Sequence, residues 1–153
     1  MSRDADVEIH LNRLPGPGGE GEASLADAVR RGVRLALGST GDAPSGEISV
    51  TCLDEDEMAD LNRRWLDREG PTDVIAFDLG TEGRLTGDVY LCPAVARRQA
   101  DEAGVDFREE LVRLAIHGTL HVLGHVHPAD EERWSSPMFR LQERLLARAL
   151  DRA

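Results

Sequence analysis

The stretch FREELVRLAIHGTLHVLGHVH, residues 107–127, joins a long apolar run to a cluster of histidines. Its apolar residues recur at helical spacing from Phe107 to Leu123, and Gly124 is a favourable residue just after a helix end. We therefore predict one long helix over Phe107–Leu123. A helix this apolar needs cover on several sides, which predicts a central place in the fold, with imidazole rings near its C-terminal end.

Three histidines are spaced to meet at that end. His117 and His121 are four residues apart, so on a helix both side chains lie on one face, about one turn apart. Gly124 lets the chain reverse, which brings His127 back toward them. The alternative is that these are ordinary polar residues near a helix C-terminus, where the positive charge of a protonated histidine is favourable. Burying two polar rings on an apolar helix without a partner is costly, however. The spacing therefore predicts an open three-histidine site for one Zn²⁺ or a similar divalent ion.

The same ligand spacing occurs in the metzincin proteases. Those enzymes carry a glutamate directly after the first histidine, where it acts as general base. Gly118 occupies that position here. The metal site is therefore expected to serve another hydrolysis, or a binding role.

The rest of the chain alternates between strand and helix periods. Strands are predicted at Val7–Leu11, Glu47–Leu53, Thr72–Leu79 and Gly87–Cys92, and further helices at Ser24–Leu37 with Ser24 as N-cap, from the cap Asp54 to Trp65, at Pro93–Ala103 and at Pro137–Leu150. The segment between the third and fourth strands is too short for a parallel crossover. We predict an α/β fold, a single domain over residues 1–153, with a small mixed sheet of about four strands packed against helices.

Composition narrows the function classes. The 153 residues hold 29 acidic and 18 basic side chains, and the net charge of −11 disfavours a protein that binds nucleic acid over a broadly basic surface. The acidity is concentrated in residues 1–60, while residues 61–127 are close to balance. No apolar run approaches the roughly 20 residues of a membrane span, so a cytoplasmic protein without membrane contact is expected. Cys52 and Cys92 have no metal-site spacing and are expected to be buried as small apolar residues.

HGTLHVLGHVH resembles the HGxLHLxGYDH signature of the bacterial YbeY-type endoribonucleases, the rRNA maturation factors. Similar motifs surround it in the family's order. They are Leu61-Asn62 ahead of Trp65, residues 71–77 resembling PTDVLSF, residues 87–89 resembling GDI, Gln99-Ala100, and residues 138–143 resembling the terminal helix. The resemblance runs from residue 47 to residue 146.

This resemblance implies a zinc ion held by His117, His121 and His127 in a cleft of an α/β fold. It implies metal-dependent cleavage of single-stranded RNA in 16S rRNA 3′-end maturation and in ribosome quality control. The implied partners are rRNA, the small ribosomal subunit and its associated proteins, all in the cytoplasm.

Two positions depart from the family pattern. His125-Val126 stand where the family has Tyr-Asp, and Leu66 stands where many relatives carry an arginine proposed to act on phosphate. The neighbouring Arg63, Arg64 and Arg68 are the candidates to contact RNA phosphate in its place, because a guanidinium can donate two hydrogen bonds to one phosphate. The alternative for each is a solvated charge on a helix face.

Three residues are candidates for proton transfer. His125 is a candidate because histidine is the side-chain type that ordinarily exchanges a proton near neutral pH. The carboxylates of Asp73 and Asp88, which lie in the motifs shared with the family, could instead act as a base or support the site. Each also has a purely structural interpretation, because both aspartates occupy turn-like positions.

Two other functions stay open on the sequence alone. A ribosome assembly factor with a mainly structural metal site is favoured by Leu66 and Val126, which both replace residues able to do chemistry. A metal-dependent hydrolase of a small or peptide substrate is disfavoured by Gly118, which provides no carboxylate after His117.

Overall fold

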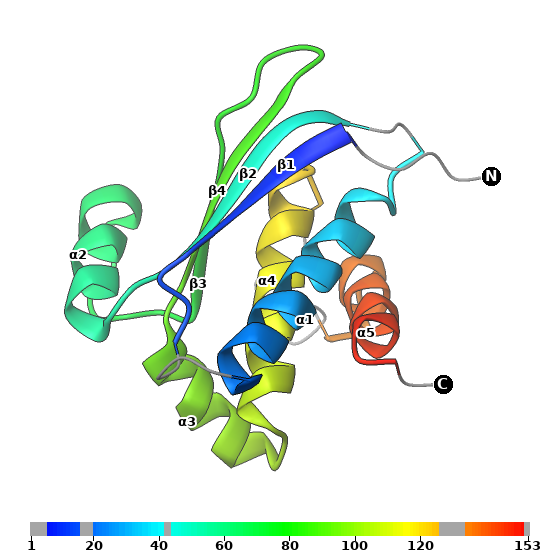
Figure 1. The fold of residues 1–153 in the computed structure, drawn as a ribbon. Helices are drawn as coiled ribbons and strands as arrows, with labels where there is room; N and C mark the ends of the chain where they lie inside the picture. Colours follow the sequence, from blue (N-terminus) through cyan, green and yellow to red (C-terminus); the bar gives the residue numbers. More distant parts are fainter. Residues whose placement is uncertain (1–5, 16–19, 42–43, 126–133, 152–153) are drawn as a thin grey trace.

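The computed structural model describes residues 6–15, 20–41, 44–125 and 134–151, which form a sheet with helices on both faces (Figure 1). The elements in chain order are β1 (Asp6–Asn12), α1 (Glu20–Leu37), β2 (Ser45–Cys52), α2 (Glu55–Leu66), β3 (Val74–Asp78), β4 (Leu85–Leu91), α3 (Pro93–Ala103), α4 (Phe107–Val122) and α5 (Pro137–Ala149). Their order is the predicted one, and the predicted α/β class is confirmed.

The four strands form one mixed sheet in the order β1-β2-β4-β3. β2 is parallel to both β1 and β4, whereas β3 is antiparallel to β4. Residues 79–84, which join β3 to β4, are too few to cross over the sheet, so the two strands pair as a hairpin. β3 is thereby an edge strand of the sheet.

Some element boundaries differ from the prediction. α1 begins at Glu20, so Ser24 lies inside the helix and its predicted role as N-cap is wrong. β2 begins at Ser45, two residues early, because Ser45 and Gly46 pair with β1 across the ladder. The alternation of apolar and polar residues along a strand does not indicate which residues pair with a distant strand.

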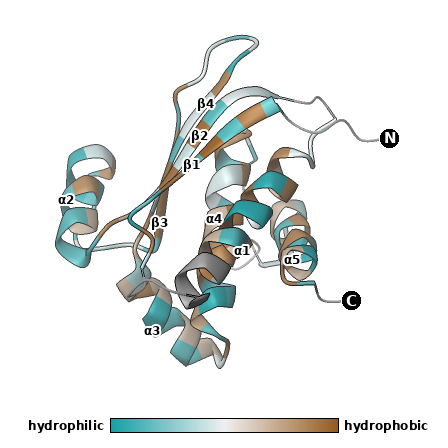
Figure 2. Cartoon of the chain, in the orientation of Figure 1, coloured by the Kyte–Doolittle hydropathy of each residue, from teal (hydrophilic) through white to brown (hydrophobic). Residues whose placement is uncertain are grey.

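The core lies between the sheet and the helices on one of its faces. Strand alternation points Val7, Ile9 and their counterparts on β2 and β4 toward this face, which α1 and α4 cover, and α5 packs against these two helices (Figures 1 and 2). α2 covers part of the other face, where Met58, Ile75 and Cys92 form a smaller cluster. α4 is central to the larger cluster: its Leu111, Val112, Ile116 and Leu120 side chains are all fully buried.

α4 packs closely on the sheet at Gly118. A Cβ at this position would lie 2.5 Å from Cγ1 of Val89 and 3.2 Å from Cγ2 of Val74, so only a glycine fits without movement of these side chains. The residue after His117 therefore points into the sheet. This contact fixes the rotation of α4 and turns the His117 side chain away from β4.

The N-terminus of α2 is held by a capping box. The Asp54 carboxylate accepts from Glu57 N at 2.8 Å, and the Glu57 carboxylate accepts from Asp54 N at 3.0 Å, as the predicted cap requires. Arg13, just after β1, donates to both Glu57 oxygens at 2.7 and 2.8 Å. These bonds from Arg13 and from the Asp54 backbone lower the pKa of Glu57 to about 2. The other end of α2, at Leu66, lines a cavity beside β3.

Both cysteines are buried free thiols, as expected. Burial raises the pKa of Cys52 to about 12 and also raises the pKa of Cys92. Neither thiol is therefore a thiolate at neutral pH, which fits two small core residues rather than nucleophiles or metal ligands.

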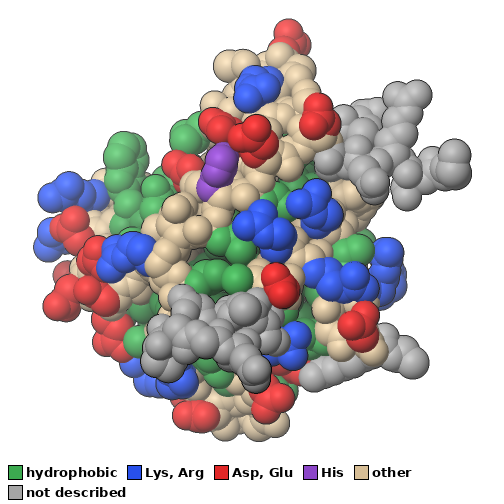
Figure 3. All heavy atoms as spheres, in the orientation of Figure 1, with side chains coloured by type: hydrophobic (Ala, Val, Ile, Leu, Met, Phe, Trp, Pro, Cys, Tyr) green, Lys and Arg blue, Asp and Glu red, His purple; other side chains and the backbone are tan. Residues whose placement is uncertain are grey.

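Both acidic and arginine side chains are exposed on the face seen in Figure 3. Among the residues that the structure describes, no helix has both the length and the apolar character needed to cross a membrane.

Candidate metal centre

His117 and His121 converge at the C-terminal end of α4. Their Nε2 atoms lie 3.1 Å apart, with ring centroids 4.6 Å apart and ring planes 71° apart. Two nitrogens that each lie about 2.05 Å from one tetrahedral zinc ion are about 3.3 Å apart. The spacing of the two nitrogens therefore fits a pair of ligands to one metal ion.

The second nitrogen of His117 is engaged by α5. Oε1 of the buried Gln142 lies 2.6 Å from His117 Nδ1. An amide oxygen only accepts hydrogen bonds, so His117 carries its proton on Nδ1 and directs an unprotonated Nε2 toward His121. A ligand histidine with its other nitrogen hydrogen-bonded in this way is typical of protein metal sites.

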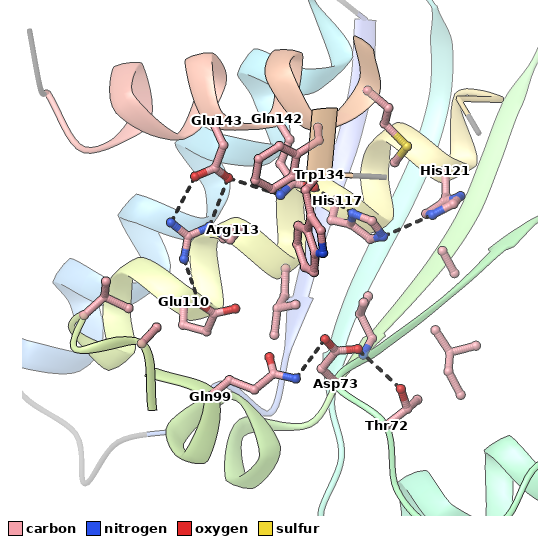
Figure 4. A pocket seen from close by; sticks show the side chains of 18 of the residues that line it. Thr72, Asp73, Gln99, Glu110, Arg113, His117, His121, Trp134, Gln142 and Glu143 are labelled. Carbon is pink, nitrogen blue, oxygen red and sulfur yellow. Dashed lines mark hydrogen bonds and ion pairs between the residues drawn. The ribbon is translucent and has the colours of Figure 1, made fainter. Parts of the chain in front are cut away.

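The two histidines line a cavity of about 920 Å³ between α4, α5 and the edge strand β3 (Figure 4). Val74, Ile75 and Ala76 of β3 form one wall, while α5 contributes Met138, Phe139, Gln142 and Glu143. Leu66 and Arg68, at the end of α2, and the half-exposed Trp134 also line it. The cavity is thus wide enough for a substrate beside the imidazoles.

A partly buried charge cluster continues from the histidines along α4. Arg113 donates to Glu143 of α5 at 3.0 and 3.1 Å. It also donates to Glu110 at 2.7 Å and to Glu109 at 3.2 Å. Burial lowers the pKa of Arg113, but the bonds and charges of Glu143 and Glu110 outweigh it, so the net pKa is raised. Burial raises the pKa of Glu110, against the opposing effect of Arg113.

The model of the family described as Endoribonuclease YbeY matches residues 20–150. The chain belongs to the endoribonuclease YbeY family. It is 43% identical over 136 residues to the endoribonuclease YbeY of Salinispora tropica, an alignment that covers 79% of this chain and 85% of that relative. The Corynebacterium glutamicum endoribonuclease YbeY is 42% identical over 156 residues, covering 92% of this chain and 76% of the relative.

A solved structure agrees with this fold. The solution structure of a Thermotoga maritima protein superposes with a TM-score of 0.59 at 26% identity, covering 94% of this chain and 89% of that one. The resemblance seen in the histidine signature and its surrounding motifs is thereby confirmed at the level of the family. Metal dependence is general for YbeY proteins.

One of the three expected ligands of this YbeY chain, His127, lies outside the described residues, as does Val126. The set of His117, His121 and His127 therefore stays a prediction, of which the structure brings the first two together. Leu66 lines the cavity with 44% of its surface exposed. An apolar side chain thus stands at the cavity in the position where the resemblance to the family pattern predicted an arginine.

The three candidates for proton transfer lie in different places. Asp73 lines the cavity opposite the histidines; its Oδ1 accepts from Val74 N at 2.7 Å and its Oδ2 from Gln99 Nε2 at 3.2 Å. Asp88 lies on the outer face of β4, where Ser49 donates to it at 2.7 Å, so the sheet separates it from α4. His125 follows α4 and is not among the residues that line the cavity.

The three arginines predicted to bind phosphate also lie in different places. Arg63 and Arg64 both form ion pairs with Asp60, at 2.7 and 3.1 Å, and neither lines the cavity. Arg68 does line it. Of the three predicted phosphate-binding residues, the structure therefore brings Arg68 to the site.

Sequence reasoning missed Arg113 and its carboxylates. A signal for them was present, because the polar residues of α4 recur at helical spacing: Glu110, Arg113, His117 and His121. On an otherwise apolar helix such a stripe faces either solvent or a polar site. The contribution of Glu143 depends on the packing of α5 against α4, which spacing within one helix does not show.

A second group of potential ligands lies elsewhere. Atoms of Glu8, His10 and Glu47 lie within 4.8 Å of one another, and all three residues are exposed. Val7 and Ile9 point to the core, so Glu8 and His10 point to the other face of the sheet, away from α4. This group has neither the buried support nor the cavity found at His117 and His121.

Proposed function

We propose that this chain is a zinc-dependent endoribonuclease that cleaves single-stranded RNA during rRNA processing. Membership of the YbeY family makes it an RNA-hydrolysing nuclease. The proposal adds zinc as the ion, a single-stranded substrate, and roles in 16S rRNA 3′-end maturation and ribosome quality control. The observation that carries it is the 3.1 Å approach of two histidine Nε2 atoms at the wall of a large cavity.

His117, His121 and His127 are the residues that would hold the ion. When bound, a zinc ion lowers the pKa of a bound water and polarises a phosphoryl oxygen. The imidazoles of His117 and His121 supply neutral nitrogen donors of the type zinc prefers, and the Gln142 amide orients the first of them. Gly118 provides no base, and a side chain at this position would point into the sheet.

Arg68 and Asp73 supply the other chemistry on the cavity wall. The guanidinium of Arg68 would bind a phosphate of the RNA and offset its charge. Asp73 is the candidate for proton transfer that lines the cavity. Its Oδ2 is held by Gln99, so the carboxylate faces the cavity in a fixed orientation.

The surface charge bears on how RNA reaches this site. At a net charge of −11 the chain gains little from long-range attraction to phosphate. We propose that docking on the small ribosomal subunit and its proteins, in the cytoplasm, brings the RNA strand to the cavity. Local contacts then need to hold only the nucleotides beside the scissile bond.

The direct test is metal content measured together with cleavage. Natively purified protein is expected to contain close to one zinc ion per chain, and to cleave a labelled single-stranded RNA but not the matching duplex. A chelator should abolish cleavage, and added Zn²⁺ should restore it. Cleavage that persists after the metal has been removed would overturn the proposal. Stoichiometric metal and binding to small subunits without any cleavage would favour an assembly factor.

Arg68 gives a second test. Arg68→Ala is expected to lower kcat/KM on single-stranded RNA about tenfold, which corresponds to about 1.4 kcal/mol, the scale of one hydrogen bond to a charged group. Arg63→Ala is the matched control, because Arg63 pairs with Asp60 outside the cavity. Zinc content should stay unchanged in both variants. Equal losses in the two variants would remove Arg68 from the site.

A further inference from the structure

The side chains behind His117 form a directed path of hydrogen bonds that leads to Arg113 (Figure 4). We propose that Glu143, held by Arg113, fixes the orientation of the Gln142 amide and so keeps His117 in the tautomer that can ligate a metal. Gln142 and Glu143 are thus positioning residues. This inference rests on the proposed metal site.

The path begins with a rigid pair. Arg113 Nε and Nη2 donate to the two oxygens of Glu143 at 3.0 and 3.1 Å, a bidentate geometry. Both side chains are partly buried, with exposed fractions of 20% for Arg113 and 33% for Glu143. The planar guanidinium therefore sets the position of the carboxylate.

The carboxylate then decides which way the amide points. Gln142 Nε2 donates to Glu143 Oε2 at 3.2 Å. A carboxylate only accepts hydrogen bonds, so the amide must present its NH₂ group to Glu143 and its oxygen to His117. The reversed amide would place its oxygen against the carboxylate. Gln142 is 4% exposed, so water has little access to relieve that repulsion.

The amide oxygen in turn selects the tautomer. At 2.6 Å from Gln142 Oε1, His117 Nδ1 has to be the protonated nitrogen. A neutral imidazole carries one proton, which leaves a lone pair on Nε2, the atom 3.1 Å from His121 Nε2. Without the carboxylate, neither orientation of the Gln142 amide is favoured over the other. His117 is then expected to populate both of its neutral tautomers.

Two pairs of residues on packed helices form this path. Arg113 and His117 are four residues apart on one face of α4, and the neighbouring residues Glu143 and Gln142 of α5 contact Arg113 and His117, respectively. Tautomer control is therefore built into the packing of α5 on α4.

The tautomer can be measured without any variant. In metal-free protein at a pH where His117 is neutral, ¹⁵N NMR of the labelled imidazoles reports which nitrogen carries the proton, and His117→Ala assigns the signal. We expect His117 to be protonated on Nδ1. A His117 signal that is mainly protonated on Nε2 would overturn the proposal.

Glu143→Gln tests the step through the carboxylate. A glutamine side chain both donates and accepts, so it no longer dictates the orientation of the Gln142 amide. We expect a mixed His117 tautomer and about tenfold weaker zinc affinity, the lower end of the 10–100-fold cost of losing an outer partner of a ligand. Zinc affinity is measured by competition with a chromophoric chelator, and thermal unfolding verifies that the variant is folded.

Glu109→Gln is the matched control, because Glu109 accepts from Arg113 but lies outside the path to Gln142. It should keep the Nδ1 tautomer and the wild-type zinc affinity. An unchanged tautomer and an affinity within twofold of wild type in Glu143→Gln would overturn the positioning role. Neither readout uses RNA, so zinc binding with tautomer control but without cleavage would count against the proposed nuclease function alone.

Discussion

His121→Ala is expected to bind no stoichiometric zinc and to lose about 100-fold or more in RNA cleavage, beyond the upper end of the cost of losing an outer partner of a metal ligand. The His121 imidazole supplies one of the two nitrogens that meet at 3.1 Å, and alanine removes that nitrogen. Elemental analysis and cleavage of a labelled single-stranded RNA measure the two losses.

The fold should survive this change. His121 is only partly buried and is the residue before the last one of α4, and alanine is the most favourable residue in a helix. Circular dichroism and thermal unfolding close to wild type are therefore expected alongside the loss of zinc. A loss of cleavage with unfolding would say nothing about ligation, whereas a folded variant that lacks zinc assigns the ligand.

His10→Ala is the matched control. It makes the same substitution in the other group of potential ligands, the exposed Glu8, His10 and Glu47 on the far face of the sheet. Zinc content and cleavage should be unchanged. If His10→Ala removes the zinc while His121→Ala retains it, the metal centre lies on the outer face of the sheet and the site proposed at α4 is wrong.

The elements that the sequence predicted well are those that are determined locally. Pro93 starts α3 at the predicted residue, and Asp54 caps α2 as its spacing to Glu57 indicates. The short link between β3 and β4 correctly predicted the hairpin. By contrast, the early start of β2 at Ser45 is stabilised by pairing with β1, a long-range contact that has no local signal.

For the site too, the sequence predicts what depends on local spacing and misses what depends on packing between elements. The histidine pair follows from spacing within one helix, and its geometry agrees with that spacing. The outward direction of Asp88 was also available from the sequence, because it lies between the inward-facing Gly87 and Val89 on a strand. The roles of Gln142 and Glu143 were not available, since they depend on how α5 packs against α4.

Gly118 shows how the structure changes a sequence argument. Its side of α4 meets Val89 and Val74, so the residue after His117 faces the sheet. The absence of a glutamate here is therefore a packing requirement of this fold as well as a departure from the protease pattern. A base for this site therefore has to come from another position, and Asp73 before β3 lines the cavity.

Gly46→Ala is expected to destabilise the protein by about 3 kcal/mol, the sum of roughly equal costs of overpacking and of a strained backbone. Gly46 has a φ of +144°, and a Cβ built on it would lie 1.8 Å from the carbonyl oxygen of Leu85. Leu85 is its partner across the β2 and β4 ladder, so the clash is with backbone that cannot turn away. The two strands have to separate at this end.

Thermal and urea unfolding measure this effect, and a change of this size should lower the Tm by about 10 °C for a domain of this length. Gly41→Ala is the matched control, because Gly41 is exposed and a Cβ there meets nothing within 4 Å. It should leave stability within about 1 kcal/mol of wild type, with any change toward stabilisation, since alanine restricts the unfolded chain. Similar small effects in both variants would contradict the close approach of β2 to β4. A large loss confined to Gly46→Ala would show that this sheet, which supports α4 and its histidines, tolerates only glycine where the two strands begin to pair.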